Sequence, residues 1–227
     1  MIDLHTHTIF SDGELLPAEL CRRLEVLGYS AVALTDHADP SNLDWMVPRI
    51  VHAAQELNAH MGIQLVPGVE LTHLPPILIA ESAARARQLG ALVVVVHGET
   101  IVEPVPPGTN HAALLCPDVD VLAHPGMLSL EDAQLAAERG VALEITSRGG
   151  HSLTNGHVAR LAQQTGAPLV LNSDAHAPKD LVPPGFADLV GRAAGLTEAQ
   201  VAKARRNAQE LLDRARSIQT RQAPPQA

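Results

Sequence analysis

The segment Glu81–Glu99, ESAARARQLGALVVVVHGE, contains the unit from which we predict the fold. Its first part has a helical pattern as far as Leu89, and Gly90 is the residue type that most often ends a helix. The apolar run Ala91–Val96 follows without alternating polar residues, as expected of a strand that is covered on both faces. It leads directly into His97-Gly-Glu99. A helix, a glycine, a buried strand and a polar strand end therefore follow one another.

The same unit recurs along the chain. Seven apolar runs have this character, and most end in a cluster that contains His, Asp or Glu: Met1–Leu4, Ala31–Leu34, Ile63–Val69, Ala91–Val96, Val119–Ala123, Val141–Ile145 and Pro168–Leu171. Helical patterns that stop at a glycine lie between them: Leu15–Leu27, Met46–Met61, Glu81–Leu89, Ala133–Arg139 and His157–Thr165. This alternation predicts an α/β fold, a seven-stranded (βα) barrel similar to the TIM barrel. A doubly wound open sheet is the alternative.

We expect a single barrel domain over residues 1–218. The motif Thr197-Glu-Ala-Gln200 resembles a capping box and begins a last helix that we expect to end near Ile218. Residues 219–227 (QTRQAPPQA) are polar and contain two prolines, which indicates a flexible C-terminal tail. No linker divides the chain.

Composition excludes several classes of protein. The 227 residues carry a formal net charge of −9 with one Trp, one Tyr and two Phe. We therefore expect no long nucleic acid as a partner, because basic patches and stacking platforms are missing. The first residues do not resemble a signal peptide, and no apolar run has the length of a membrane span. Cys21 and Cys116 are expected to be reduced core residues. These features predict a cytoplasmic protein without membrane contact.

The twelve histidines are the unusual feature of the composition. In a (βα) barrel the C-terminal strand ends meet on the face that holds the active site. Six histidines and two acids stand at these ends, and Asp12 follows the first strand closely: His5, His7, His37, Glu70, His97, His124, Asp174 and His176. Residues two positions apart, as in His5-x-His7, point to the same side of an extended segment. So many imidazoles and carboxylates in one cavity predict a site for several divalent metal ions.

The other six histidines have different placements. Five lie in or beside helical patterns, and we expect them at the surface or behind the ligands: His52, His60, His111, His151 and His157. His73 follows Glu70 by three positions. It is a candidate for contact with a substrate at the mouth of the site.

These motifs resemble those of the polymerase and histidinol phosphatase (PHP) family. The likeness extends from residue 1 to about residue 180 and includes, in order, His5-Thr-His-Thr-Ile-Phe-Ser-Asp-Gly13, Thr35-Asp-His37, Pro67-Gly-Val-Glu70, His97, Ala123-His-Pro125 and Asn172-Ser-Asp-Ala-His176. The resemblance implies a distorted seven-stranded barrel, three divalent metal ions (Zn, Mn or Fe) and hydrolysis of phosphate esters. Among the branches of the family, the stand-alone histidinol phosphatases are the most similar.

The resemblance also implies a ligand set for each ion. It assigns His5, His7, Glu70 and Asp174 to the first ion, Glu70, His97 and His124 to the second, and Asp12, His37 and His176 to the third. Glu70 would bridge the first two ions. A hydroxide between them is the expected nucleophile, because bound divalent ions lower the pKa of water to about 7. Asp12 and His37 are candidates to protonate the leaving group.

Two further residues are candidates for substrate binding. The planar guanidinium of Arg148, at the end of the sixth strand, suits a phosphate or carboxylate group, with a structural salt bridge as the alternative. Glu99 is placed to meet a cationic substrate group, with a position behind the ligands or a capping role as the alternatives. We therefore predict a metal-dependent phosphoesterase that hydrolyses a small phosphomonoester similar to histidinol phosphate. The alternatives are a nucleotide or oligonucleotide phosphatase or exonuclease, and a metal-loaded binding or regulatory barrel.

Overall fold

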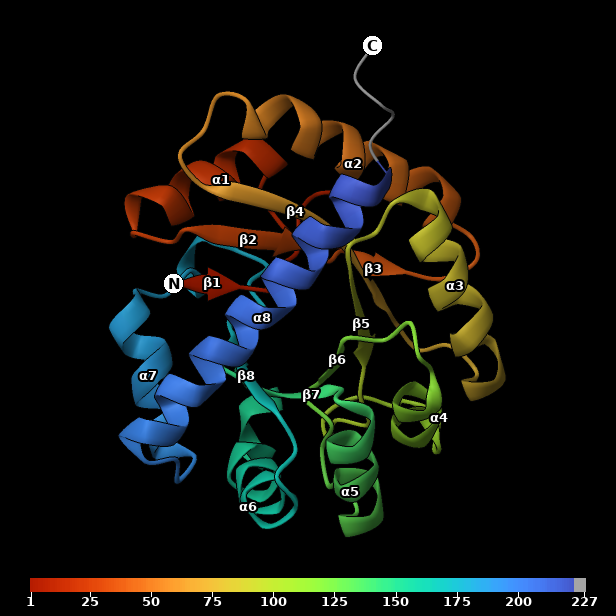
Figure 1. Ribbon diagram of the computed structural model, residues 1–227, viewed down its shortest axis with the longest axis vertical. Coiled ribbons are helices and arrows are strands. Elements are labelled where there is room, and N and C mark those ends of the chain that lie inside the picture. Colours follow the sequence, from red (N-terminus) through yellow and green to blue (C-terminus); the bar gives the residue numbers. More distant parts are fainter. Residues whose placement is uncertain (223–227) are drawn as a thin grey trace.

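Seven parallel strands form the wall of a barrel in the computed structural model, which describes residues 1–222 and side chains as far as Gln219. They pair in the order β1-β2-β4-β5-β6-β7-β8, and the short strand β3 (His37–Ala38) pairs with the end of β4. The seven strands are β1 (Ile2–Asp3), β2 (Ala31–Leu34), β4 (Gln64–Leu71), β5 (Val93–His97), β6 (Val121–Ala123), β7 (Ala142–Thr146) and β8 (Leu169–Asn172). They surround a common axis with the helices outside (Figure 1), which confirms the predicted barrel.

The barrel closes where the first strand meets the segment after the last one. The backbone N–H of Asp174 donates to the carbonyl oxygen of His5 at 3.0 Å, and the N–H of His7 donates to the carbonyl oxygen of Ala175 at 2.9 Å. These bonds continue the parallel pairing beyond β1 and β8, with an isolated bridge between Thr6 and Ala175. The barrel is therefore nearly closed, and the alternative of a doubly wound open sheet is wrong.

Helices connect the strands on the outside of the barrel, as the glycine-terminated patterns predict. Gly90, Gly140 and Gly166 each end a helix in the left-handed conformation that glycine adopts without strain. Within residues 1–222, no helix has the length and apolar character needed to cross a membrane. The helices are α1 (Pro17–Val26), α2 (Leu43–Asn58), α3 (Ile79–Leu89), α4 (Thr109–Leu115), α5 (Leu130–Arg139), α6 (Asn155–Thr165), α7 (Pro184–Ala193) and α8 (Glu198–Gln222), with short 3-10 helices η1 (Pro76–Leu78), η2 (His151–Thr154) and η3 (Pro178–Asp180).

Helix α8 begins at the predicted capping box. The backbone N–H of Thr197 donates to the side-chain oxygen of Gln200 at 2.8 Å, and the N–H of Gln200 donates to the hydroxyl of Thr197 at 3.3 Å. The helix continues past the expected end at Ile218, so residues 219–222 are helical rather than part of a tail. The rest of the predicted tail, residues 223–227, lies outside the described residues.

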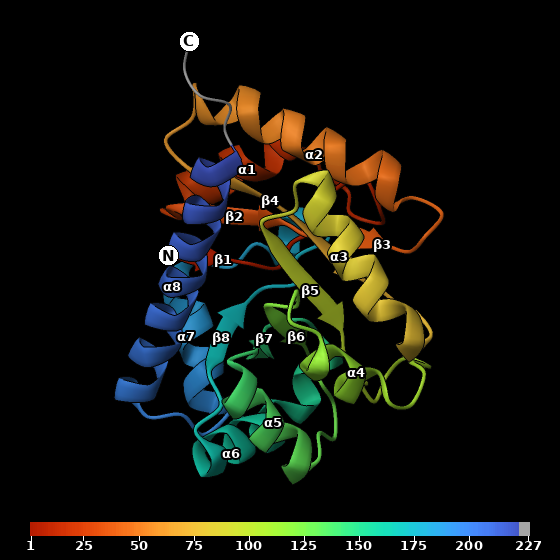
Figure 2. The same cartoon turned by 45° about the vertical axis from the view of Figure 1, so that its right-hand side comes forward.

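The interior of the barrel is apolar and is covered at one end by α8. Leu4, Val66 and Val121 belong to an inner cluster that also contains Leu212 and Ala208 of the helix. Figure 1 shows α8 crossing this end of the barrel, and Figure 2 shows it beside β8. The helix thus covers the end at which the strands begin. Polar side chains gather at the opposite end, where the strands finish.

Replacing Leu212 by Ala is expected to lower the free energy of unfolding by about 2–5 kcal/mol, because the substitution leaves a cavity under the barrel. Unfolding in urea, followed by circular dichroism, measures this change. Leu153→Ala is the matched control, since that side chain is 70% exposed and its loss should cost little. Equal losses in the two variants would show that α8 does not support the inner core.

Candidate metal centre

Glycines near the ends of β5 and β6 let the segments that follow these strands approach each other closely. A Cβ at Gly98 would lie 2.3 Å from the carbonyl oxygen at the end of β6. A Cβ at Gly126, whose φ is +63°, would lie 1.8 Å from the carbonyl oxygen of Glu99. Glycine alone permits such approaches. As a result, the ring centroids of His97 and His124 lie 4.5 Å apart.

Four buried side chains meet at the end of the barrel where the strands finish. Three come from the segments that close the barrel and one comes from β4: His5, His7, Asp174 and Glu70. Nε2 of His5 lies 3.3 Å from Oε1 of Glu70 and 3.7 Å from Oδ1 of Asp174. Nε2 of His7 lies 3.7 Å from Oε2 of Glu70 and 3.2 Å from the same oxygen of Asp174. Ligand atoms around a tetrahedral ion with bonds of about 2.0–2.2 Å are about 3.3–3.6 Å apart. These spacings therefore suit a divalent ion.

A second group adjoins the first and shares Glu70 with it. Nε2 of His124 lies 3.6 Å from Oε1 of Glu70 and 3.6 Å from Oδ2 of Asp174. His97 packs edge-on against the ring of His124. One oxygen of Glu70 therefore faces both groups, and its bridging of two ions stays a prediction.

The third group lies on the other side of His7. Oδ1 of Asp12 is 3.6 Å from Nε2 of His37 and 3.3 Å from Nε2 of His176. Nδ1 of His7 is 3.9 Å from the same Asp12 oxygen. The structure thus brings all nine predicted ligands together, in three adjoining groups at one end of the barrel.

Several polar atoms of the centre are buried without a hydrogen-bond partner. They include Nε2 of His5, both ring nitrogens of His7, Oε1 of Glu70 and Nδ1 of His124. Such an unpaired buried group costs about 1–3 kcal/mol, and folded proteins contain few of them. Imidazole nitrogens and carboxylate oxygens are ordinary ligands of zinc and manganese. The unpaired atoms therefore fit a centre that is completed by divalent ions.

Burial and mutual charge perturb the protonation of these groups. Burial opposes the charged form of His5, yet the carboxylates of Glu144 and Glu70 raise its pKa well above the usual value. Burial, together with neighbouring imidazoles, lowers the pKa of His7 well below the usual value. Burial raises the pKa of Asp174 to about 7. Protons and metal ions compete for the same ring nitrogens and carboxylate oxygens, so ion binding would displace these protons.

Glu144 is a carboxylate of the centre that sequence reasoning missed. It lies in the middle of β7 and is fully buried, and its Oε1 is 2.8 Å from Nδ1 of His5. The side-chain amide of Asn172 donates to the same oxygen at 2.8 Å, and the backbone N–H of His124 donates to Oε2 at 3.2 Å. Because Nδ1 of His5 is engaged, its Nε2 is directed toward the ligand position. The sequence does contain a signal for Glu144, because it is the one charged residue in the buried strand Ala142–Thr146.

Asp36 holds the loop that carries Asp12. Its Oδ1 accepts hydrogen bonds from the backbone N–H groups of Thr8 at 2.7 Å and Ser11 at 3.1 Å, and from the Ser11 hydroxyl at 2.9 Å. The loop is thereby tied to the end of β2. The sequence reasoning missed this residue, although it stands next to His37 in a predicted motif.

Arg148 lies at the rim and forms the structural salt bridge that we named as an alternative. Its Nη1 donates to Oδ2 of Asp180 at 3.1 Å. The same oxygen accepts the backbone N–H groups of His176 at 3.2 Å and Ala177 at 3.0 Å. Arg148 is therefore tied to the segment that carries a third-group ligand, and its contact with phosphate stays a prediction.

Glu99 and His73, the other predicted substrate contacts, have different settings. Oε1 of Glu99 accepts the backbone N–H groups of Gly108 at 3.0 Å and Asn110 at 2.9 Å, at the start of α4. The Glu99 side chain therefore caps α4, which is one of the alternatives to contact with a substrate. The ring of His73 lies 5.0 Å from that of His97, and its contact with a substrate stays a prediction.

His151 and Glu103 lie in the centre, although the motifs include neither. His151, expected at the surface or behind the ligands, is buried beside them, with its ring stacked on His124 at 4.1 Å. Oε2 of Glu103 lies 3.0 Å from Nε2 of His73 and 3.2 Å from Nε2 of His97. Glu103 comes from the irregular segment after β5, and His151 begins the short 3-10 helix η2 after β7; no periodic signal marks either residue. The remaining histidines of the expected surface set lie outside the centre: His52, His60, His111 and His157.

Backbone strain is concentrated at the same end of the barrel. Among residues 1–222, three residues other than glycine have positive φ: His73 at 54°, His124 at 28° and Asp174 at 53°. Such conformations cost about 1–3 kcal/mol each and persist where the surrounding structure holds them. All three lie at strand ends that face the centre, which supports a functional role for this end.

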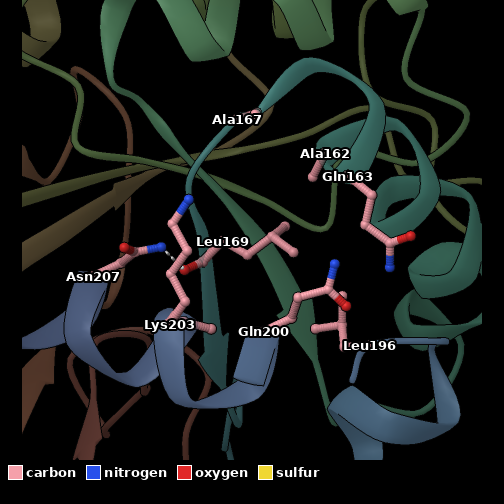
Figure 3. Close-up of a pocket in the computed structure, with 10 residues that line it drawn as sticks. Ala162, Gln163, Ala167, Leu169, Leu196, Gln200, Lys203 and Asn207 are labelled. Atoms are coloured by element: carbon pink, nitrogen blue, oxygen red, sulfur yellow. Dashed lines mark hydrogen bonds between the residues drawn. The ribbon is translucent and has the colours of Figure 1, made fainter. Parts of the chain in front are cut away.

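A separate pocket lies at the opposite end of the barrel (Figure 3). It is lined by the connection between α6 and β8 and by α8, where the side-chain amide of Asn207 donates to the carbonyl oxygen of Leu169 at 2.8 Å. Lys203 is the one charged residue among those that line it. The pocket therefore has no set of metal ligands and does not belong to the centre.

Comparisons with known proteins define the class of protein. The PHP domain family matches residues 3–118. An uncharacterized protein of Methanocaldococcus jannaschii is 50% identical over 200 residues, which cover 88% of this chain and 92% of that protein. Ribonuclease P protein component 3 of Methanosarcina mazei is 30% identical over 208 residues, 83% of this chain and 80% of that protein.

The structural comparison agrees with these relatives. A chain in the structure of archaeal ribonuclease P with mature tRNA has a TM-score of 0.75 at 15% identity, with coverage of 100% of this chain and 96% of that chain. At this identity the likeness concerns the fold alone. The protein belongs to the PHP domain family, whose members are generally metal-dependent phosphoesterases.

Replacing Glu144 by Gln is expected to weaken the binding of one divalent ion by about 10- to 100-fold, because the substitution removes the anionic partner that orients His5. Titration calorimetry with Zn²⁺ measures the change. Glu138→Gln on the exposed face of α5 is the control and should bind Zn²⁺ as the wild type does. Unchanged affinity in the Glu144 variant would contradict its role in orienting His5.

Proposed function

We propose that the protein is a metal-dependent phosphoesterase that releases inorganic phosphate from a small phosphomonoester. The observation that carries the proposal is the cluster of nine imidazole and carboxylate side chains, most of them buried, in which atoms of His5, His7, Glu70 and His124 have no hydrogen-bond partner. Membership of the PHP family supports the same chemistry. Each of the three groups would hold one ion.

Bound divalent ions would supply a Lewis acid for phosphoryl oxygens and a water molecule with a pKa lowered to about 7. The chain provides the geometry. Oε1 of Glu70 faces His5 at 3.3 Å and His124 at 3.6 Å, while its Oε2 is 2.6 Å from Nδ1 of His37. Glu70 is fully buried and thus contacts residues of all three groups.

The third group is the most accessible part of the centre. The side chain of Asp12 is 55% exposed and that of His37 is 26% exposed, whereas His5 and Glu70 are fully buried. As ligands of an ion, Asp12 and His37 would keep no proton to donate, so the ion that they would hold is what could stabilise the charge on a leaving oxygen. We therefore assign the departure of the leaving group to the exposed side of Asp12 and His37.

Replacing Glu70 by Ala is expected to remove two ions together and to lower phosphate release by at least about 100-fold, because both groups lose a shared ligand. Elemental analysis and an assay of phosphomonoesters, with Mn²⁺ and Zn²⁺ supplied separately and histidinol phosphate included, measure both effects. Glu138→Ala is the control. Unchanged metal content in the Glu70 variant would contradict the bridging assignment.

Replacing Arg148 by Ala is expected to raise KM for phosphomonoesters about 10-fold with little change in kcat, because a charged contact with bound phosphate is lost. Steady-state kinetics measure this, with Arg139→Ala as the exposed control. Asp180→Asn separates the two roles of Arg148, since it removes the salt bridge but keeps the guanidinium. If Asp180→Asn alone reproduces the effect, Arg148 acts through the salt bridge and does not contact phosphate.

An RNA-associated role is the second candidate. The relationship to ribonuclease P protein component 3 favours it. The described part of α8 exposes five cations and three acids, and Arg205, Arg214 and Arg216 form ion pairs with carboxylates. The relationship, rather than the charge of this helix, therefore carries the candidate. A metal-loaded protein that cleaves no phosphate ester but binds RNA in a strongly salt-dependent manner would favour this candidate over the phosphoesterase.

A further inference from the structure

Glu103 is held beside the second group by three imidazoles. Its Oε2 lies 3.0 Å from Nε2 of His73 and 3.2 Å from Nε2 of His97, and its Oε1 lies 3.3 Å from Nε2 of His151. Glu103 belongs to none of the three ligand groups described above. Three ring nitrogens from separate segments therefore converge on one carboxylate of the chain itself.

The contacts of His151 identify its Nε2 as a hydrogen-bond donor. An ionised carboxylate only accepts hydrogen bonds, so the nitrogen that faces Glu103 carries a hydrogen. Nδ1 of His151 lies 2.8 Å from the hydroxyl of Thr100 and accepts its hydrogen. Both residues are buried, which holds the pair in place. An N–H group in this direction suits an anion and does not suit a metal ion, whose ligands present a lone pair.

His73 offers a second donor to the same carboxylate. Its backbone has a φ of 54°, in the left-handed region that a residue other than glycine rarely adopts. Such strain persists where the surrounding structure holds it, and it is concentrated at ligand sites. The His73 side chain is 36% exposed, so burial of the ring does not account for the strain. The strained conformation instead accompanies the placement of a donor.

The backbone that carries Glu103 is anchored independently of its side chain. Glu99 caps α4 four residues earlier, and Val102 packs against Gly150, where a Cβ would lie in ordinary contact at 3.5 Å. The Glu103 side chain itself is 38% exposed. A rotation of this side chain into solvent therefore vacates its position and leaves the donors where they are.

Resting on the proposed function, we propose that His73 and His151 form a binding position for the phosphoryl group of the substrate, next to His97, and that Glu103 fills this position in the free protein. Oxygens of the phosphoryl group replace those of the carboxylate and accept the same hydrogen bonds. A phosphoryl group has one more terminal oxygen than a carboxylate, and this oxygen is free to meet an ion held by the second group. Glu103 is thus a competitor of phosphate within the chain.

Calorimetric titration of the metal-loaded, full-length protein with inorganic phosphate tests the proposal. Glu103→Ala is expected to bind phosphate at least about 10-fold more tightly than the wild type, because phosphate no longer displaces a carboxylate. The zinc content of the variant, measured by elemental analysis, is expected to stay unchanged. Glu138→Ala, at an exposed position of α5, is the control and should match the wild type in both measurements.

A double-mutant cycle with His73→Asn separates competition from simple charge repulsion. Asn tolerates the left-handed backbone, but its side chain is shorter and does not reach the anion. In the Glu103→Ala background, His73→Asn is expected to weaken phosphate binding by about 10-fold, because a donor is lost. With Glu103 present the loss is smaller, since the displaced carboxylate loses the same hydrogen bond. His151→Phe, which keeps an aromatic ring on His124, is expected to behave in the same way.

Equal phosphate affinity in the wild type and Glu103→Ala would overturn the proposal. Additive effects of Glu103→Ala and His73→Asn would also overturn it, because Glu103 would then repel phosphate from a distance. Loss of an ion from Glu103→Ala would overturn it too, because the carboxylate would then be a metal ligand. Should His151→Phe fail to fold, the cycle with His73→Asn decides alone.

The proposed function fails by a different result. A wild type that binds phosphate as expected but releases none from any phosphomonoester would overturn the phosphoesterase and leave the binding position intact. A wild type that cleaves phosphomonoesters but has the same phosphate affinity as Glu103→Ala would overturn the binding position alone.

Discussion

The closure of the barrel between β1 and the segment after β8 is the constraint on which the rest of the structure depends. The two backbone hydrogen bonds at this seam, from Asp174 to His5 and from His7 to Ala175, join parts of the chain that are about three quarters of the sequence apart. They place the paired ligands of the first strand against those of the last, and Glu70 of β4 then completes the set. Without this closure the first group would be split between the two edges of an open sheet. The long helix α8 supports the closure from the other end, because it covers the inner core where the strands begin.

Without bound ions, the centre lowers the stability of the folded protein. It buries carboxylates and imidazoles with unpaired atoms, and it holds His73, His124 and Asp174 in strained backbone conformations. Polar groups in such a setting destabilise a fold unless a partner compensates. The mutual ion pairs of the cluster compensate in part, as shown by the raised pKa of His5 and the pKa of His37, which Glu70 raises to about 9 against the effect of burial. Divalent ions would satisfy the same atoms more completely. Metal binding is therefore expected to stabilise the fold as well as to supply the chemistry.

The sequence was sufficient to predict the fold and the nine motif residues for a physical reason. Apolar runs such as Ala91–Val96 and helix-ending glycines such as Gly90 are local signals, and the barrel itself brings strand ends together whatever the loops do. The same logic fails for residues whose position depends on the path of a loop. His151 follows two glycines, and Glu103 lies in the irregular segment between β5 and α4, so that neither has a periodicity that would reveal its direction. Glu99 follows the end of β5, but its side chain caps α4. This contact depends on the residue at which α4 begins, which the sequence does not reveal. Glu144 could have been found, because a carboxylate inside a fully buried strand needs a partner.

The central claim is that the three groups at the C-terminal ends of the strands each hold a divalent ion. Anomalous X-ray scattering from crystals grown with Mn²⁺ or Zn²⁺ tests it directly, because it locates ions independently of any assay of activity. Three peaks are expected in each chain, at about 2.0–2.2 Å from the ligand atoms of the three groups, with Glu70 between the first two. Peaks confined to the surface, or an absence of peaks among these side chains, would contradict it.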